Sequence, residues 1–175
     1  MTGTGSVTGQ RSAYGTPLVT RKSALRCADP NEGDDRRGTM LAVEDLDGRR
    51  VLSAGGWDPR YAVTLAVASC GDVGAVLIDT NGDEADIDLD VYRRDAAGVW
   101  QEISSSVVGD GGGFLSGEIA VILGRTEPGR IVDIEYAGRR SSTMASLTGW
   151  WLSVNVAVPG VDDFPRLIGT RPTTV

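Results

Sequence analysis

The sequence of 175 residues contains no histidine. Without an imidazole the chain cannot form a Ser-His-Asp or Cys-His catalytic arrangement, a histidine proton shuttle or any of the usual catalytic zinc sites. Its two cysteines are too few for a structural zinc site. Most hydrolase chemistries are therefore excluded, and carboxylates are the acid–base groups that remain.

Cysteine, lysine and long apolar runs are also scarce. No apolar run approaches the ~18–20 residues that span a bilayer, and residues 1–10 lack the apolar core of a signal peptide. We therefore expect a cytoplasmic protein that binds no membrane, with Cys27 and Cys70 as free thiols, although export would favour a disulfide. Lys22 is the sole lysine among 17 basic residues, which indicates a bias in genome composition.

The net charge is −7, with a pI near 4.6. An acidic field repels phosphate backbones, and the arginines are scattered along the chain in pairs, so we expect no nucleic-acid partner. The same charge favours a basic protein partner. The oligomeric state is left open.

Short apolar runs separated by turn residues dominate the chain from Thr39 onward, and this pattern is typical of β-structure. We expect residues 1–38 to be largely irregular and residues 39–170 to form an antiparallel β-sandwich of about 8–10 short strands with hairpin connections. The strands are expected at 61–69, 74–78, 85–92, 99–104, 117–123, 131–136, 140–147 and 150–157, and no amphipathic helix of three turns is evident.

Turn residues predict how the strands are joined. Asp47-Gly48 predicts a first hairpin between Met40–Asp45 and Arg49–Ser53, and Asn81-Gly82 is the strongest hairpin signal in the chain. The segment 109–113, which contains four glycines, is predicted to be a flexible loop. The tail after Pro159 is expected to pack across a sheet edge and then fray.

Three turn motifs occur in a recognisable order, namely Pro128-Gly129, Ala137-Gly138 and Gly149-Trp150. Residues 117–157, which contain them, resemble bacterial Ig-like modules, in which a Pro-Gly turn, a strand and a short hairpin precede a Gly-Trp pair that opens the final strand. The resemblance implies a β-sandwich. It implies no activity, because such folds host many functions.

The acidic segment 79–90 has two interpretations. Asp79, Asn81, Asp83 and Asp90 stand at positions 1, 3, 5 and 12 of an EF-hand-like loop, which predicts a possible calcium site, although position 6 lacks its glycine. The alternative, which we favour, is a hairpin whose Asp86, Asp88 and Asp90 form a solvated acidic face. No other cofactor is expected.

The other charged candidates are carboxylates and arginine pairs. A glycosidase-like hydrolase would need two carboxylates facing each other across a cleft; the candidates are Asp86, Asp88, Asp90, Glu118, Asp133 and Glu135. The arginine pairs at 36–37, 49–50, 93–94 and 139–140 could grip an anionic partner, but we favour strand-end charges that pair with nearby carboxylates.

Tryptophan provides the best candidate binding residues: Trp57, Trp150 and Trp151. Adjacent residues of a strand point to opposite faces, so one of Trp150 and Trp151 is expected in the core and the other outside it or under the tail. An exposed tryptophan is a typical interface anchor. We therefore expect a non-enzymatic binding or protein-interaction domain, with a carboxylate-based hydrolase or a calcium-stabilised structural module as alternatives.

Overall fold

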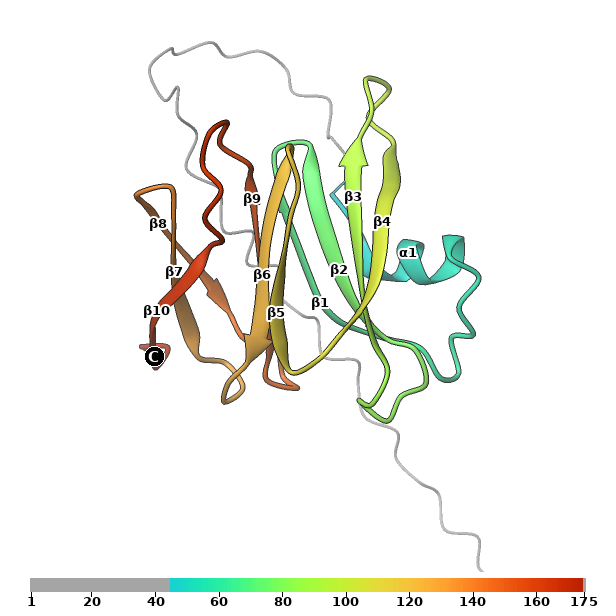
Figure 1. Ribbon diagram of the computed structural model, residues 1–175. Helices are drawn as coiled ribbons and strands as arrows, with labels where there is room; N and C mark the ends of the chain where they lie inside the picture. The colour runs from blue at the N-terminus through green and yellow to red at the C-terminus, as the bar shows by residue number, and fades with distance from the viewer. Residues whose placement is uncertain (1–44, 175) are drawn as a thin grey trace, which may run out of the picture.

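The computed structural model describes residues 45–174, in which one short helix precedes ten strands (Figure 1). The predicted all-β fold is therefore confirmed, and every strand pair is antiparallel. The elements are α1 (Gly48–Ala54), β1 (Val63–Cys70), β2 (Val73–Asp79), β3 (Ile87–Arg94), β4 (Trp100–Val108), β5 (Gly111–Leu115), β6 (Ile119–Arg125), β7 (Ile131–Tyr136), β8 (Arg139–Met144), β9 (Trp150–Val156) and β10 (Arg166–Arg171).

The strands form three sheets, which we name A, B and C. Sheet A has the order β1-β2-β3-β4, sheet B the order β5-β6-β9 and sheet C the order β10-β7-β8. Figure 1 shows sheet C on the left, sheet B in the middle and sheet A on the right, with α1 beside sheet A. Strand β9 of sheet B contacts strands of both other sheets.

Sheets A and B share the largest apolar core. Alternate residues of β3, namely Ile87, Leu89 and Val91, point into it, as the alternating sequence predicts. They meet Trp150 of β9, whose exposed fraction is 1% and which is the largest fully buried side chain among the described residues. Burial of an indole of this size makes β9 the centre of the packing between the two sheets.

The predicted first hairpin is wrong, because Gly48–Ala54 is the helix α1. Asp47 is its N-cap, and the Oδ1 atom of Asp47 accepts hydrogen bonds from the backbone N–H groups of Arg49 and Arg50. Asp-Gly can either form a tight turn or begin a helix, and here the capping role prevails. Val51 of the helix then packs on the face of sheet A that is turned away from sheet B.

The glycine-rich segment is also not the loop that its composition predicts, because Gly111–Leu115 is strand β5 and pairs with β6. Phe114 packs against the core between sheets A and B and holds the strand in register. Tertiary pairing thus overrides the weak strand propensity of glycine. In the tail, Arg166–Arg171 forms β10, which pairs with β7 at the edge of sheet C.

Cys70 is disulfide-bonded, so the prediction of a free thiol is wrong for this residue. Cys27 and the segment 1–38 lie outside the described residues, as does the predicted strand that begins at Met40. Within residues 45–174, no helix has the length and apolar character needed to cross a membrane.

Candidate functional site

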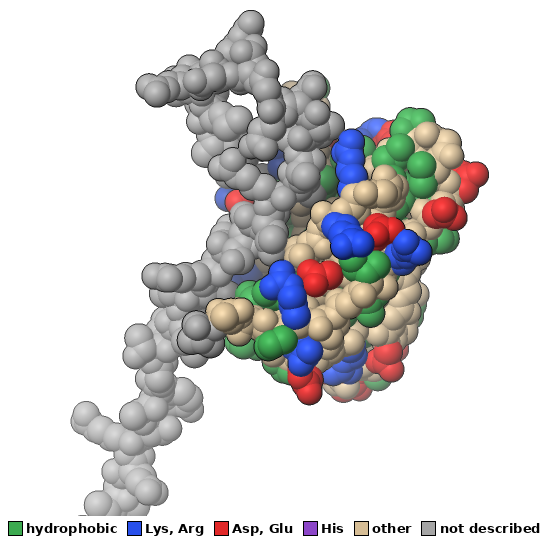
Figure 2. Space-filling model, turned by 90° about the vertical axis from the view of Figure 1, so that its left-hand side faces the viewer, with side chains coloured by type: hydrophobic (Ala, Val, Ile, Leu, Met, Phe, Trp, Pro, Cys, Tyr) green, Lys and Arg blue, Asp and Glu red, His purple; other side chains and the backbone are tan. Residues whose placement is uncertain are grey.

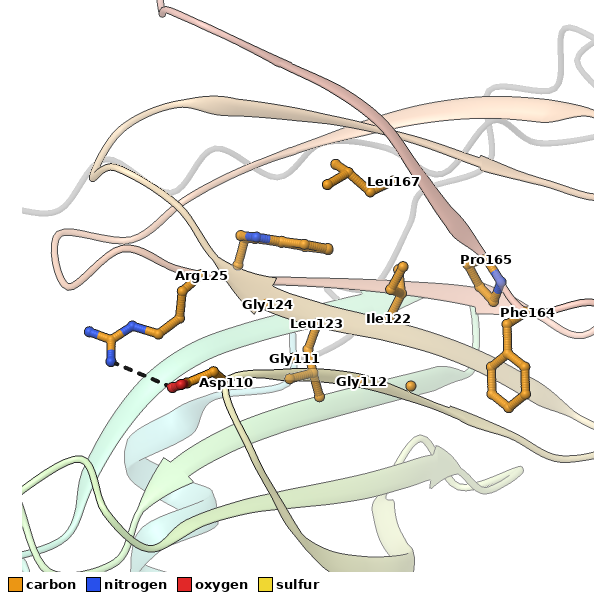
Figure 3. A pocket seen from close by; sticks show the side chains of 12 residues that line it. Asp110, Gly111, Gly112, Ile122, Leu123, Gly124, Arg125, Phe164, Pro165 and Leu167 are labelled. Atoms are coloured by element: carbon orange, nitrogen blue, oxygen red, sulfur yellow. Dashed lines mark ion pairs between the residues drawn. The ribbon is translucent and has the colours of Figure 1, made fainter.

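A groove of about 460 Å³ opens beside β5, the edge strand of sheet B (Figure 3). The register places Gly111, Gly113, Ile122, Gly124 and Trp151 on one face of this sheet, the face turned to sheet C. The full lining consists of Asp110, Gly111, Gly112, Gly113, Ile122, Leu123, Gly124, Arg125, Trp151, Phe164, Pro165 and Leu167. The groove is therefore mainly apolar, with one charged pair.

Glycine makes the floor of the groove. A Cβ atom on Gly124 would lie 2.7 Å from a ring carbon of Trp151, its partner across β6 and β9. The absence of a side chain at 124 therefore lets the indole lie against β6. Gly111, Gly112 and Gly113 leave the neighbouring strand equally bare.

The wall of the groove comes from the chain entering β10. Phe164 is 55% exposed and Leu167 is 49% exposed, whereas Pro165 between them is buried. The ring of Phe164 approaches Gly113 so closely that a Cβ atom there would lie 3.1 Å from it. Two large apolar side chains thus stand half-exposed at the same groove.

Arg125 closes one end of the groove, opposite the end where Phe164 and Pro165 lie in Figure 3. Its guanidinium group pairs with Glu84 at 2.7 Å and with Asp110 at 3.9 Å, and it stacks over the ring of Trp150 at 5.0 Å. Arg125 is therefore held in place by sheet A and sheet B together, and its charge is largely neutralised.

The backbone of β5 is paired on one side only. Strand β6 pairs with it, and no other described strand does so. In an antiparallel ladder every second residue of an edge strand directs its N–H and C=O outward. The groove therefore adjoins backbone donors and acceptors that pair with no other strand among residues 45–174.

Two of the three predicted tryptophans, Trp57 and Trp150, lie outside the groove. Trp150 and Trp151 point to opposite faces, as expected, but both are buried, at 1% and 5% exposed. The expected exposed partner is absent because sheet C forms another layer over Trp151, against Val132 and Ile134. Trp57 packs beside the cluster under α1. Of the three, Trp151 alone lines the groove.

The acidic loop 80–86 is organised by Asp79. This carboxylate is 2% exposed and accepts hydrogen bonds from the N–H groups of Asn81 (3.3 Å), Gly82 (2.8 Å) and Glu84 (3.0 Å). The two-residue Asn-Gly turn is therefore replaced by a longer loop, since Asp79 pairs with Ile87 across the hairpin. The Asp79 carboxylate therefore accepts hydrogen bonds from backbone N–H groups in place of coordinating a cation.

The other predicted calcium ligands do not gather around Asp79. Asp83 accepts from the N–H of Ala85, and Asp90 lies further along β3, opposite Val76 of β2. Among residues 45–174, no group of three or more Asp, Glu or Cys side chains is placed to hold a metal ion.

The prediction of a solvated acidic face is partly wrong, because Asp90 is 3% exposed and accepts a hydrogen bond from the Tyr92 hydroxyl at 3.3 Å. Burial, followed by the charges of Asp90 and Asp86, raises the pKa of Asp88. Burial also raises the pKa of Tyr92, and Asp90 adds to that shift. Part of this face of sheet A is covered by the apolar cluster under α1, to which Tyr92 belongs, and is not exposed to solvent.

The remaining hydrolase candidates are held by arginines. Glu118 pairs with Arg93 at 2.7 Å. Asp133 and Glu135 lie on sheet C, whereas Asp88 and Asp90 lie on sheet A, so the two groups are on different sheets. None of these carboxylates lines the groove beside β5.

The arginine pairs 93–94 and 139–140 lie at strand ends and make ion pairs, whereas 49–50 lies in α1 and 36–37 lies outside the described residues. Arg93 pairs with Glu118, Arg94 contacts Asp72 at 3.9 Å, and Arg140 contacts Glu135 at 3.5 Å. Figure 2, which views the side where sheet C lies, shows basic and acidic side chains interspersed over this face. The pattern favours mutual neutralisation over a basic patch.

The ion pairs of sheet C predict an acid-sensitive contribution to stability. A hydrogen bond from Ser142, followed by the charge of Arg171, lowers the pKa of Asp133 below its ordinary value near 3.8. A lowered carboxyl pKa stabilises the fold above the unfolded value, and this stabilisation is lost as the pH falls through the folded value. We expect Asp133→Asn to lower the melting temperature at pH 7 and to flatten its decline below about pH 4; parallel curves for variant and wild type would contradict this.

Comparison with known proteins gives no lead: no family model, no curated protein and no solved structure matches this chain. Of the residues that line the groove, the sequence predicts Trp151 as a binding residue. Gly111–Gly113 lies in the predicted loop, and Phe164 and Leu167 lie in the predicted tail. The signal for a wall in that tail is the apolar pair Phe164-Pro165.

Proposed function

We propose that this chain is a non-enzymatic protein-interaction domain, built as a β-sandwich from sheets A and B, whose partner binds in the groove beside β5. The observation that carries the proposal is the half-exposed pair Phe164 and Leu167 facing a glycine floor. Extended segments of partner proteins are often bound at a sheet edge, with pockets that take their side chains. The missing histidine and the dispersed carboxylates support a binding role over hydrolysis.

The disulfide at Cys70 indicates the compartment in which the protein would bind its partner. Disulfides persist mainly in oxidising compartments. This favours an exported protein over the cytoplasmic location that the N-terminal sequence predicts.

A matched pair of leucine substitutions tests the site. Leu167 lines the groove, whereas Leu147, at 88% exposed, lies in the turn before β9 and does not line it. We expect Leu167→Asp to weaken binding of the partner at least tenfold, because a carboxylate in the groove must be desolvated when the partner binds. Leu147→Asp should leave binding unchanged.

The measurement begins with capture by the immobilised full-length chain, compared between wild type and both variants by quantitative mass spectrometry. Proteins that depend on Leu167 are then purified and their Kd values are measured, together with the melting temperature of each variant. Equal binding by wild type and a folded Leu167→Asp variant would overturn the proposed function.

A further inference from the structure

Strand β5, like the edge strands β1 and β9, lacks the charged residues that the other three edge strands carry. In sheet C, the edge strands β8 and β10 carry arginines at 139, 140, 166 and 171, and β4 of sheet A carries Glu102. Strands β1 and β9 contact each other. Strand β5 has the sequence Gly-Gly-Gly-Phe-Leu, with no charge and no proline. Proteins usually blunt edge strands with such residues, so an edge that lacks them is suited to pairing.

The groove matches a strand added at this edge. Side chains of a fourth strand beside β5 would alternate between the two faces of sheet B. Those on the face of Gly111 and Gly113 would lie next to Phe164 and Leu167, where no β5 side chain obstructs them. Backbone pairing would then supply affinity, and the groove would select an apolar side chain.

The charge around the groove selects what flanks that side chain. The Asp110 side chain is 90% exposed, and Asp162 and Asp163 are exposed just before Phe164. No ion pair to another described residue is present for Asp162 or Asp163, whereas Arg125 pairs with Glu84 and Asp110, and Arg166 pairs with Glu135. Asp162 and Asp163 therefore place uncompensated negative charge next to Phe164, in a chain of net charge −7.

We propose that the groove binds an extended segment of a partner protein as a fourth strand of sheet B, with an apolar side chain against Phe164 and Leu167 and lysine or arginine side chains beside Asp162 and Asp163. This inference rests on the proposed function and defines the chemistry of its partner. The acidic border contributes mainly to the rate and selectivity of association, and the strand pairing to its lifetime.

Three capped peptides labelled with fluorescein test the inference on the full-length protein. The first alternates lysine and valine, the second alternates glutamate and valine, and the third is the lysine–valine peptide with alternate backbone nitrogens methylated. We expect the first to bind at least ten times more tightly than either of the others by fluorescence anisotropy, and to slow amide exchange in Gly111–Leu115.

Charge variants supply a matched control. Changing Asp162 and Asp163 to asparagine should weaken binding of the lysine–valine peptide at least threefold. Changing Asp45, which precedes α1, and Glu102, which lies on β4 of sheet A, to Asn and Gln removes the same charge and should have less effect. Equal effects of the two double variants would mean that net charge alone attracts the peptide, and would overturn the inference.

Two results separate this inference from the function on which it rests. If Leu167→Asp abolishes capture of a partner but the three peptides bind alike, strand addition is wrong and the groove remains the binding site. If Leu167→Asp leaves partner binding intact, the proposed function is wrong whichever peptide binds.

Discussion

Replacing Trp150 with alanine is expected to lower the free energy of unfolding by about 3–5 kcal/mol, the range for large aromatic residues removed from a core. Trp150 is 1% exposed and lies among residues of both sheet A and sheet B. Its removal would also leave Arg125 without the ring on which it stacks. Chemical denaturation with equilibrium fluorescence or circular dichroism measures this loss.

Trp150→Phe is the control for volume. The indole Nε1 of Trp150 is buried without a hydrogen-bond partner, so phenylalanine removes an unsatisfied donor while it keeps an aromatic ring. We expect Trp150→Phe to lower the free energy of unfolding by less than half as much as Trp150→Ala does. A Trp150→Ala protein as stable as wild type would mean that the two sheets do not share this core.

Replacing Asp79 with alanine is expected to cost about 2–3 kcal/mol, because three backbone N–H groups lose their acceptor. Asp83→Ala, which removes an exposed acceptor for the single N–H of Ala85, should cost less than about 1 kcal/mol. Thermal and chemical unfolding of both variants, each with and without millimolar Ca²⁺, checks the comparison.

Unfolding measured with and without Ca²⁺ distinguishes a loop in which Asp79 binds backbone N–H groups from a loop that binds calcium. If Asp79 serves the backbone, its removal should have the same effect with and without Ca²⁺. A rise in the wild-type melting temperature with Ca²⁺ that disappears in Asp79→Ala would show that the loop oxygens bind the ion instead.

The strands with an alternating apolar pattern could be predicted from the sequence. Ile131–Tyr136 has the predicted bounds, and β9 begins at Trp150 as expected, because a half-buried strand imposes a period of two on its residues. The turns at Ala137-Gly138 and Gly149 were also predictable, since their positive φ angles favour glycine.

The features that the sequence predicted wrongly depend on contacts between residues far apart in the chain. Asp47-Gly48 has the same local signal as a hairpin turn, and it caps a helix because Val51 can pack on sheet A. Trp151 is covered by a sheet whose position no local pattern gives. The glycines of β5 became a strand through pairing with β6, and this is why the candidate site could not be predicted from composition.

The central claim is that a partner binds beside β5. Amide chemical-shift mapping of the full-length protein, titrated with a partner whose binding depends on Leu167, tests it most directly. We predict that the largest perturbations fall in Gly111–Leu115, in Ile122–Arg125 and around Phe164, the elements that form the groove. Perturbations concentrated instead on the charged face of sheet C, at Asp133 and Glu135, would contradict the account.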